Sequence, residues 1–101
     1  MKTRIELQGM LEELLGSENV YYQKPPSTGM KYPAILYSKG GINTKNANNN
    51  KYSMNIRYEI IVISKTPDHP VINKLLSLPY CVYDRPYISD NLYHDVLTLY
   101  Y

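Results

Sequence analysis

Few residues in this sequence could carry acid–base, metal or nucleophilic chemistry. There are two histidines, His69 and His94, and one cysteine, Cys81. The acids that could act with them are Asp68, Asp84, Asp90 and Asp95. None of these side chains has the spacing that would bring a base beside a nucleophile or gather the ligands of a metal ion. We therefore expect no enzymatic activity, no metal and no cofactor.

These groups have structural interpretations instead. Asp68 stands two residues before Pro70, a pattern typical of a helix start with Asp68 as the N-cap. Cys81 lies between tyrosine and valine, where a small buried thiol is common. The glycine pair at 40–41 belongs to no phosphate-binding motif. We expect these residues to shape the fold rather than to react.

The length and composition indicate one small domain that spans residues 1–101. Apolar residues make up 44% of the chain and charged residues 20%, as in an ordinary globular protein. A chain of this size buries only about 60 to 65% of its unfolded surface, so we expect stability to be shared with a neighbouring subunit. The lone cysteine excludes an internal disulfide and favours a reducing compartment. The longest aliphatic run, residues 60–63, is too short to span a membrane.

The aromatic residues are unusual because all twelve are tyrosines. A tyrosine fills space with its ring and keeps a hydroxyl for water or a partner, so this choice favours half-buried sheet faces and protein contacts. A sheet with two covered faces could equally absorb most of the rings.

Charge is distributed unevenly. No acid occurs from residue 19 to 58, and that stretch carries six cations: Lys24, Lys31, Lys39, Lys45, Lys51 and Arg57. The first eighteen residues carry four acids against two cations, and the last forty-three carry five acids against three. Such a profile allows head-to-tail pairing between copies or contact with nucleic acid. The lysines could also simply be solvated in loops.

Periodicity predicts the N-terminal elements. Thr3 and Glu6 are spaced as a capping box, and Gly16 ends the helix that they begin. Its apolar stripe is Leu7, Met10, Leu11, Leu14 and Leu15. Short strands are predicted over residues 20–23 and 34–38.

The C-terminal part is predicted to hold the centre of the sheet. Apolar and polar residues alternate over 52–63, which indicates a long central strand. The preceding polar stretch, 39–51, predicts a long loop. A short helix follows near Asp68, then strands over 80–84 and 92–101 with a loop between them. The order α-β-β-β-α-β-β predicts an α+β fold with a mostly antiparallel sheet of four or five strands and both helices on one face.

A sheet of this kind needs its edges covered. A strand rich in tyrosine, leucine and valine pairs with other chains when one side is unpaired, and we expect the C-terminal strand to be that edge. An internal position is equally compatible with its sequence. Association into a closed ring would cover an edge. A small module that binds DNA without sequence recognition is the weaker alternative, because the cations are spaced singly.

Several segments resemble a family of small virion proteins from tailed bacteriophages and prophages. The similar segments are Val20-Tyr21-Tyr22-Gln23-Lys24-Pro25-Pro26, residues 30–38, residues 57–68, residues 78–85, Tyr87 and residues 90–96. The family is that of the tail terminator, or tail-to-head joining, proteins of long non-contractile tails. The similarity extends over about residues 20–101.

The resemblance implies a subunit of a hexameric ring that caps the tail tube, stops tail polymerisation and joins the tail to the head. The implied partners are further copies, the major tail tube protein, the head-closure or connector proteins, and DNA that passes through the lumen; no membrane is involved. The implied location is the tail–head junction of the virion, after assembly in the host cytoplasm. A head-closure or connector protein is the alternative. We expect the contact residues to be Lys39, Lys45, Lys51, Arg57, Asp84, Arg85, Tyr87, Asp90 and Tyr101.

Overall fold

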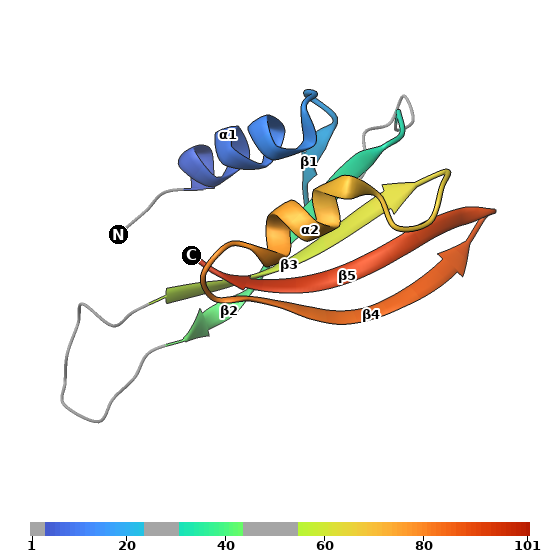
Figure 1. The fold of residues 1–101 in the computed structure, drawn as a ribbon. Coiled ribbons are helices and arrows are strands. Elements are labelled where there is room, and N and C mark those ends of the chain that lie inside the picture. The colour runs from blue at the N-terminus through green and yellow to red at the C-terminus, as the bar shows by residue number, and fades with distance from the viewer. Residues whose placement is uncertain (1–3, 24–30, 44–54) are drawn as a thin grey trace, which may run out of the picture.

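The computed structural model describes residues 4–23, 31–43 and 55–101 (Figure 1). The elements in chain order are α1 (Arg4–Leu15), β1 (Val20–Tyr22), β2 (Ala34–Asn43), β3 (Asn55–Ser64), α2 (Pro70–Leu76), β4 (Cys81–Ser89) and β5 (Leu92–Tyr100). They form the expected α+β fold in the expected order.

The five strands make one sheet with the order β1-β2-β3-β5-β4. Only β1 and β2 run parallel, and the other neighbours are antiparallel. The strand with the clearest alternation, β3, is central as predicted. The expectation that the C-terminal strand forms an edge is wrong, because β5 lies between β3 and β4. Val96 and Leu97 of β5 are buried on opposite faces, which suits an inner strand.

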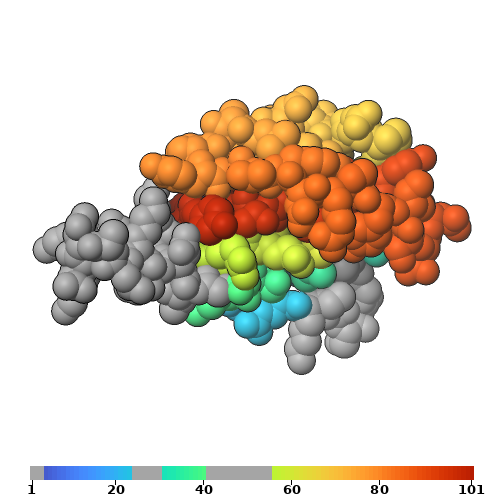
Figure 2. Space-filling model, turned by 90° about the horizontal axis from the view of Figure 1, so that it is seen from below, coloured from blue at the N-terminus to red at the C-terminus, as the bar shows by residue number. Residues whose placement is uncertain are grey.

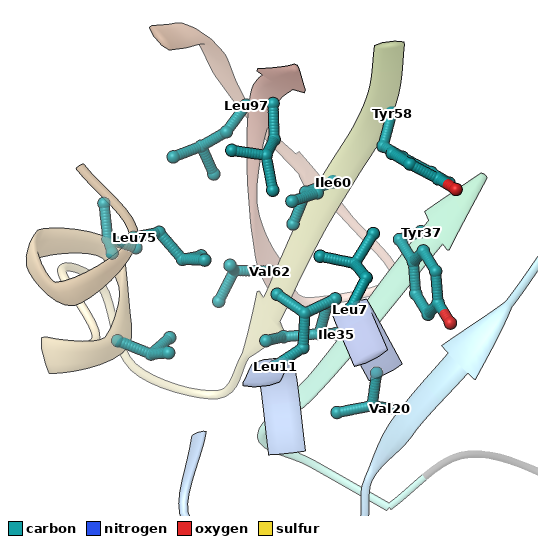
Figure 3. Close-up of a cluster of buried hydrophobic side chains, with 13 residues drawn as sticks. Leu7, Leu11, Val20, Ile35, Tyr37, Tyr58, Ile60, Val62, Leu75 and Leu97 are labelled. Carbon is teal, nitrogen blue, oxygen red and sulfur yellow. The ribbon is translucent and has the colours of Figure 1, made fainter. Parts of the chain in front are cut away.

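Both helices cover the same face of the sheet (Figure 1). Leu7 and Leu11 of α1, with Leu75 of α2, pack onto side chains that alternate along the strands (Figure 3). The strand residues of this core include Ile35, Tyr37, Tyr58, Ile60, Val62, Leu97 and Leu99. Figure 2 shows the opposite face, where β4, β5, β3 and β2 lie side by side. The two-residue period of the strands thus places the apolar stripe of β3 under the helices.

Helix α1 is fixed at its end and along its inner side. Gly16 has a φ of 81° and its amide donates to the carbonyl of Glu12 at 2.9 Å, as in a glycine-ended helix. Gln8 donates to the carbonyl of Val20 at 3.0 Å, which ties the helix to β1. Thr3, the first member of the expected capping box, lies outside the described residues.

Strand β2 is longer than the sequence indicated. The expected loop started at Lys39, but β2 continues to Asn43, which pairs with Asn55 of β3. The register shifts between Lys39 and Gly41, where a β-bulge accommodates the glycine pair. The polar residues extend the strand because β3 offers them backbone partners. The rest of the expected loop, with Lys45 and Lys51, lies outside the described residues.

Strand β4 also extends beyond its expected end. Residues 85–91 were expected to form a loop, but residues 85–89 pair with β5, with Pro86 opposite Asp95. Proline is tolerated there because β4 is an edge strand. The true turn is Asp90–Asn91, whose φ values of 53° and 62° match the positive φ that a tight hairpin turn requires.

The start of α2 differs from the prediction by one residue. The N-cap is His69, whose Nδ1 accepts a hydrogen bond from the amide of Val71 at 3.1 Å. Asp68, expected as the N-cap, has a φ of 56° and belongs to the preceding turn. Pro70 opens the helix, as expected from its fixed φ.

Candidate functional site

The free edge of the sheet at β4 carries most of the exposed large apolar side chains among the described residues. Tyr80, Val82 and Ile88 are 74%, 58% and 67% exposed, and Tyr83 and Tyr87 are close to 40%. The others, Ile5 and Leu76, lie on the helices. A contiguous apolar surface along an edge strand is a typical site for contact with another protein chain.

The register of β4 distributes these side chains over both faces of the sheet. Val82 lies opposite Thr98, on the face without helices, whereas Tyr83 lies opposite the core residue Leu97. The register shifts between Tyr83 and Arg85, so a β-bulge interrupts the strand at its middle. Strand β4 therefore presents apolar side chains on both faces of the sheet, the one that carries the helices and the one without them.

Four of the expected contact residues lie together on the β4–β5 hairpin. Asp84 and Arg85 form an ion pair with 3.0 Å between the carboxylate and guanidinium atoms, and both side chains are well exposed. The ring of Tyr87 stacks on His94 at a centroid distance of 4.5 Å and an interplanar angle of 17°. Asp90 occupies the turn. The structure thus groups these four on one exposed strand and its turn.

The other expected contact residues are placed elsewhere. Lys39 and Arg57 are exposed on β2 and β3. Lys39 is opposite Tyr58, on the face that carries the helices, whereas Arg57 points to the other face and donates to the carbonyl of Gly40 at 2.8 Å. Tyr101 is half-buried against the core, and its backbone pairs with Ile56. Burial raises the pKa of Tyr101.

A pocket of about 480 Å³ lies beside β4, and sequence reasoning missed it. The segment that follows β3 forms one wall and the β4–β5 hairpin forms the other. Its lining residues are Pro67, Asp68, Tyr83, Pro86, Tyr87, Ile88, Tyr93, His94 and Asp95. Only the observed strand register and the path of the β3–α2 connection bring these residues together, so no sequence motif could have identified the pocket.

One hydrogen bond organises this pocket. The hydroxyl of Tyr83 donates to Oδ1 of Asp95 at 2.6 Å. This bond to the carboxylate raises the pKa of Tyr83 to about 12, with smaller contributions from burial and from the charges of Asp95 and Asp68. A tyrosine with such a pKa stays protonated at neutral pH and holds the carboxylate in place.

The remaining reactive groups offer no catalytic arrangement within the described ranges. No three side chains of His, Cys, Asp or Glu gather there as metal ligands. Cys81 is half-buried, and burial raises the pKa of its thiol, which disfavours the nucleophilic thiolate. Neither described helix has the length and apolar character needed to cross a membrane. The exposed apolar side chains and unpaired backbone of β4, beyond which no described strand lies, are suited to contact with another protein chain.

Comparisons of the chain with protein-family models, with curated proteins and with solved structures gave no match.

Proposed function

We propose that this protein is a structural assembly subunit that associates through its β4 edge, and that the assembly is a ring that caps a phage tail tube and joins it to the head. The exposed apolar edge is the observation that carries the proposal. The strand is nine residues long, and no described strand lies beyond it. Its backbone groups on that side can pair with a second chain.

The middle of the β4 edge carries features that hinder pairing with another strand, whereas its two ends do not. Pro86, the bulge and the Asp84–Arg85 ion pair are devices that limit uncontrolled pairing along an edge strand. The apolar side chains of Val82 and Ile88 lie on either side of these devices. This pattern favours a defined partner over indiscriminate aggregation.

The positions of the described cations favour assembly over DNA binding. A nucleic-acid-binding surface concentrates Lys and Arg on one face. Lys39 and Arg57 instead point to opposite faces of the sheet. Exposed Lys31 precedes the start of β2, at the other end of that strand from Arg57's partner Gly41. These three cations therefore do not form one continuous stripe.

The resemblance to tail terminator proteins suggests which assembly this is, a ring at the end of a tail tube. Its segments lie largely on β1, on β2, on β3 and on the β4–β5 hairpin, so they include the exposed edge. A ring of subunits at the end of a tail tube would bury that edge. It would also let DNA pass through the lumen without reading its sequence.

The experiment is to measure association of the purified protein alone and with the tail tube protein of the same genome. Sedimentation velocity and electron microscopy should show a closed ring, either free or on tube ends. Val82→Lys and Ile88→Lys place a charge at the edge and should abolish the ring. In infected cells these variants should leave unjoined heads and tails.

The matched control is Ile5→Lys. Ile5 is 75% exposed, like the edge residues, but it lies on α1, which packs at the β1–β2 side of the sheet. This variant should assemble as the wild type does. A wild-type protein that stays monomeric and leaves tube ends bare would overturn the proposal, as would edge variants that assemble normally.

A further inference from the structure

The pocket beside β4 combines aromatic walls with two carboxylates. Tyr83, Tyr87 and Tyr93 line it, together with Asp68 and Asp95. Its volume of about 480 Å³ lies within the range of roughly 300–1,000 Å³ that is typical of ligand pockets. It is large enough for one long side chain and the backbone beside it.

The charges in the pocket select the chemistry of its occupant. The lining contains no lysine or arginine, so the two carboxylates face no cation from the pocket itself. Tyr83 occupies Oδ1 of Asp95 and holds that carboxylate in a fixed position. Aromatic rings beside a carboxylate attract an ammonium or guanidinium group through charge pairing and cation–π contact. The occupant is therefore a cation.

The chain's own cations at the far end of β2 and β3 cannot reach this pocket within one molecule. Arg57 lies five residues along β3 from Val62, whose partner on β5 is the pocket carboxylate Asp95. That separation is about 17 Å at roughly 3.4 Å per residue. Lys39 lies near Arg57 on β2, and β3 and β5 separate that strand from β4. Contact requires a second molecule.

We infer that the pocket receives the exposed side chain of Lys39 from a second copy, because Arg57 points to the opposite face of the sheet and donates to the carbonyl of Gly40. This inference rests on the proposed assembly and adds the residues that join its subunits. The two surfaces lie at opposite ends of the sheet and differ in sequence, so the contact is head to tail. Repeated head-to-tail contacts close into a ring when the rotation between subunits returns to its start.

The test is a double-mutant cycle on association, measured by sedimentation at several protein concentrations. Asp68→Asn suits the positive φ of this position, because asparagine tolerates it as aspartate does. Asp68→Asn and Lys39→Gln should each weaken association about tenfold, because they remove the two sides of one contact. The double variant should be no weaker than the worse single variant. Glu13→Gln, on the exposed side of α1, is the control that should change nothing.

A second measurement uses salt. A contact between a cation and two partly exposed carboxylates weakens as ionic strength rises, and Asp68→Asn should reduce that dependence. The edge variant at Val82, a residue that does not line the pocket, should keep this salt dependence in whatever association remains.

The outcomes separate the inference from the proposed function. Rings that form normally with Asp68→Asn, or effects of the Asp68 and Lys39 substitutions that simply add, would overturn the inference and leave the assembly standing. A wild-type chain that associates neither with itself nor with tube ends would overturn both the inference about the pocket and the proposed function.

Discussion

The hydroxyl of Tyr83 donates a 2.6 Å hydrogen bond to Asp95 across the β4–β5 pair. Tyr83 lies opposite Leu97, so Asp95 is its diagonal neighbour on the same face of the sheet. The bond joins the exposed edge strand to an inner strand on the side of the pocket. It therefore couples the position of the edge to the position of a carboxylate that we assign to subunit contact.

The Asp95→Asn substitution tests this bond through the pKa of Tyr83. The carboxylate is the main reason that this pKa is raised to about 12, so its loss should move the pKa back toward the ordinary value of 10. Burial and Asp68 remain and should keep it slightly above that value. Ring resonances of Tyr83 followed by NMR over alkaline pH would give the answer.

Asp84→Asn is the matched control, because Asp84 is an exposed acid on the same strand that pairs with Arg85. It should leave the titration of Tyr83 unchanged. Equal shifts in the two variants would mean that general charge, and not the hydrogen bond, sets this pKa.

The folded protein should lose stability in alkaline solution. The pKa values of Tyr37 and Tyr58 are raised chiefly by burial, and that of Tyr83 chiefly by its hydrogen bond to Asp95. The folded state thus binds these protons more tightly than the unfolded state does. This tighter proton binding contributes fully to the free energy of unfolding below the unfolded tyrosine pKa of about 10. The contribution is lost as pH rises through the higher pKa values of the folded state.

Urea unfolding at a series of pH values would measure this loss. The free energy of unfolding should be nearly constant below pH 9 and should fall above the ordinary tyrosine pKa of about 10. Tyr37→Phe should make the fall shallower, because it removes one of the buried hydroxyls. A free energy that rose in this range would contradict the assigned directions.

The strand β3 shows what the sequence could predict about the fold. Its alternation depends only on the two-residue period of a strand, so the buried residues Tyr58, Ile60 and Val62 were identifiable without a partner. The apolar stripe of α1 follows in the same way from the helical period, with Leu7 and Leu11 fully buried. These patterns fixed the element order and the fold class.

The ends of β2 and β4 show which parts of the fold could not be predicted from the sequence. Residues 39–43 contain two glycines and a single apolar side chain, Ile42, and they form a strand because β3 pairs with them. Pro86 is typical of a strand break, yet an edge strand tolerates it, and the edge depends on the strand order. The pocket needs that order as well, since Tyr83 and Asp95 are twelve residues apart and meet only across a hairpin.

Gln8 should contribute strongly to the docking of α1. Its side chain accepts a hydrogen bond from the hydroxyl of Tyr37 and donates to the carbonyl of Val20 at 3.0 Å. Tyr37 is fully buried. The Gln8→Ala substitution removes both bonds, and we expect a loss of about 1–3 kcal/mol in the free energy of unfolding.

Urea unfolding of Gln8→Ala beside Glu13→Ala would check this value. Glu13 is exposed on the same helix, so its replacement controls for helix propensity at almost no cost. Equal stability of the two variants would show that the hydroxyl of Tyr37, which also accepts a hydrogen bond from Arg4 at 3.5 Å, finds another acceptor for its proton.

The turn at Asp90–Asn91 should be sensitive to side-chain shape. Asn91 has a φ of 62°, a conformation that glycine adopts freely, asparagine tolerates and a β-branched residue resists. We expect Asn91→Gly to be close to neutral and Asn91→Val to lower the free energy of unfolding by roughly 1–2 kcal/mol. Ser89→Val is the control, because Ser89 is exposed at the end of β4, where valine suits a strand. Asn91→Val should also weaken ring formation, since this turn holds the edge strand against β5. A stable Asn91→Val variant that assembles normally would show that the hairpin does not depend on its positive φ.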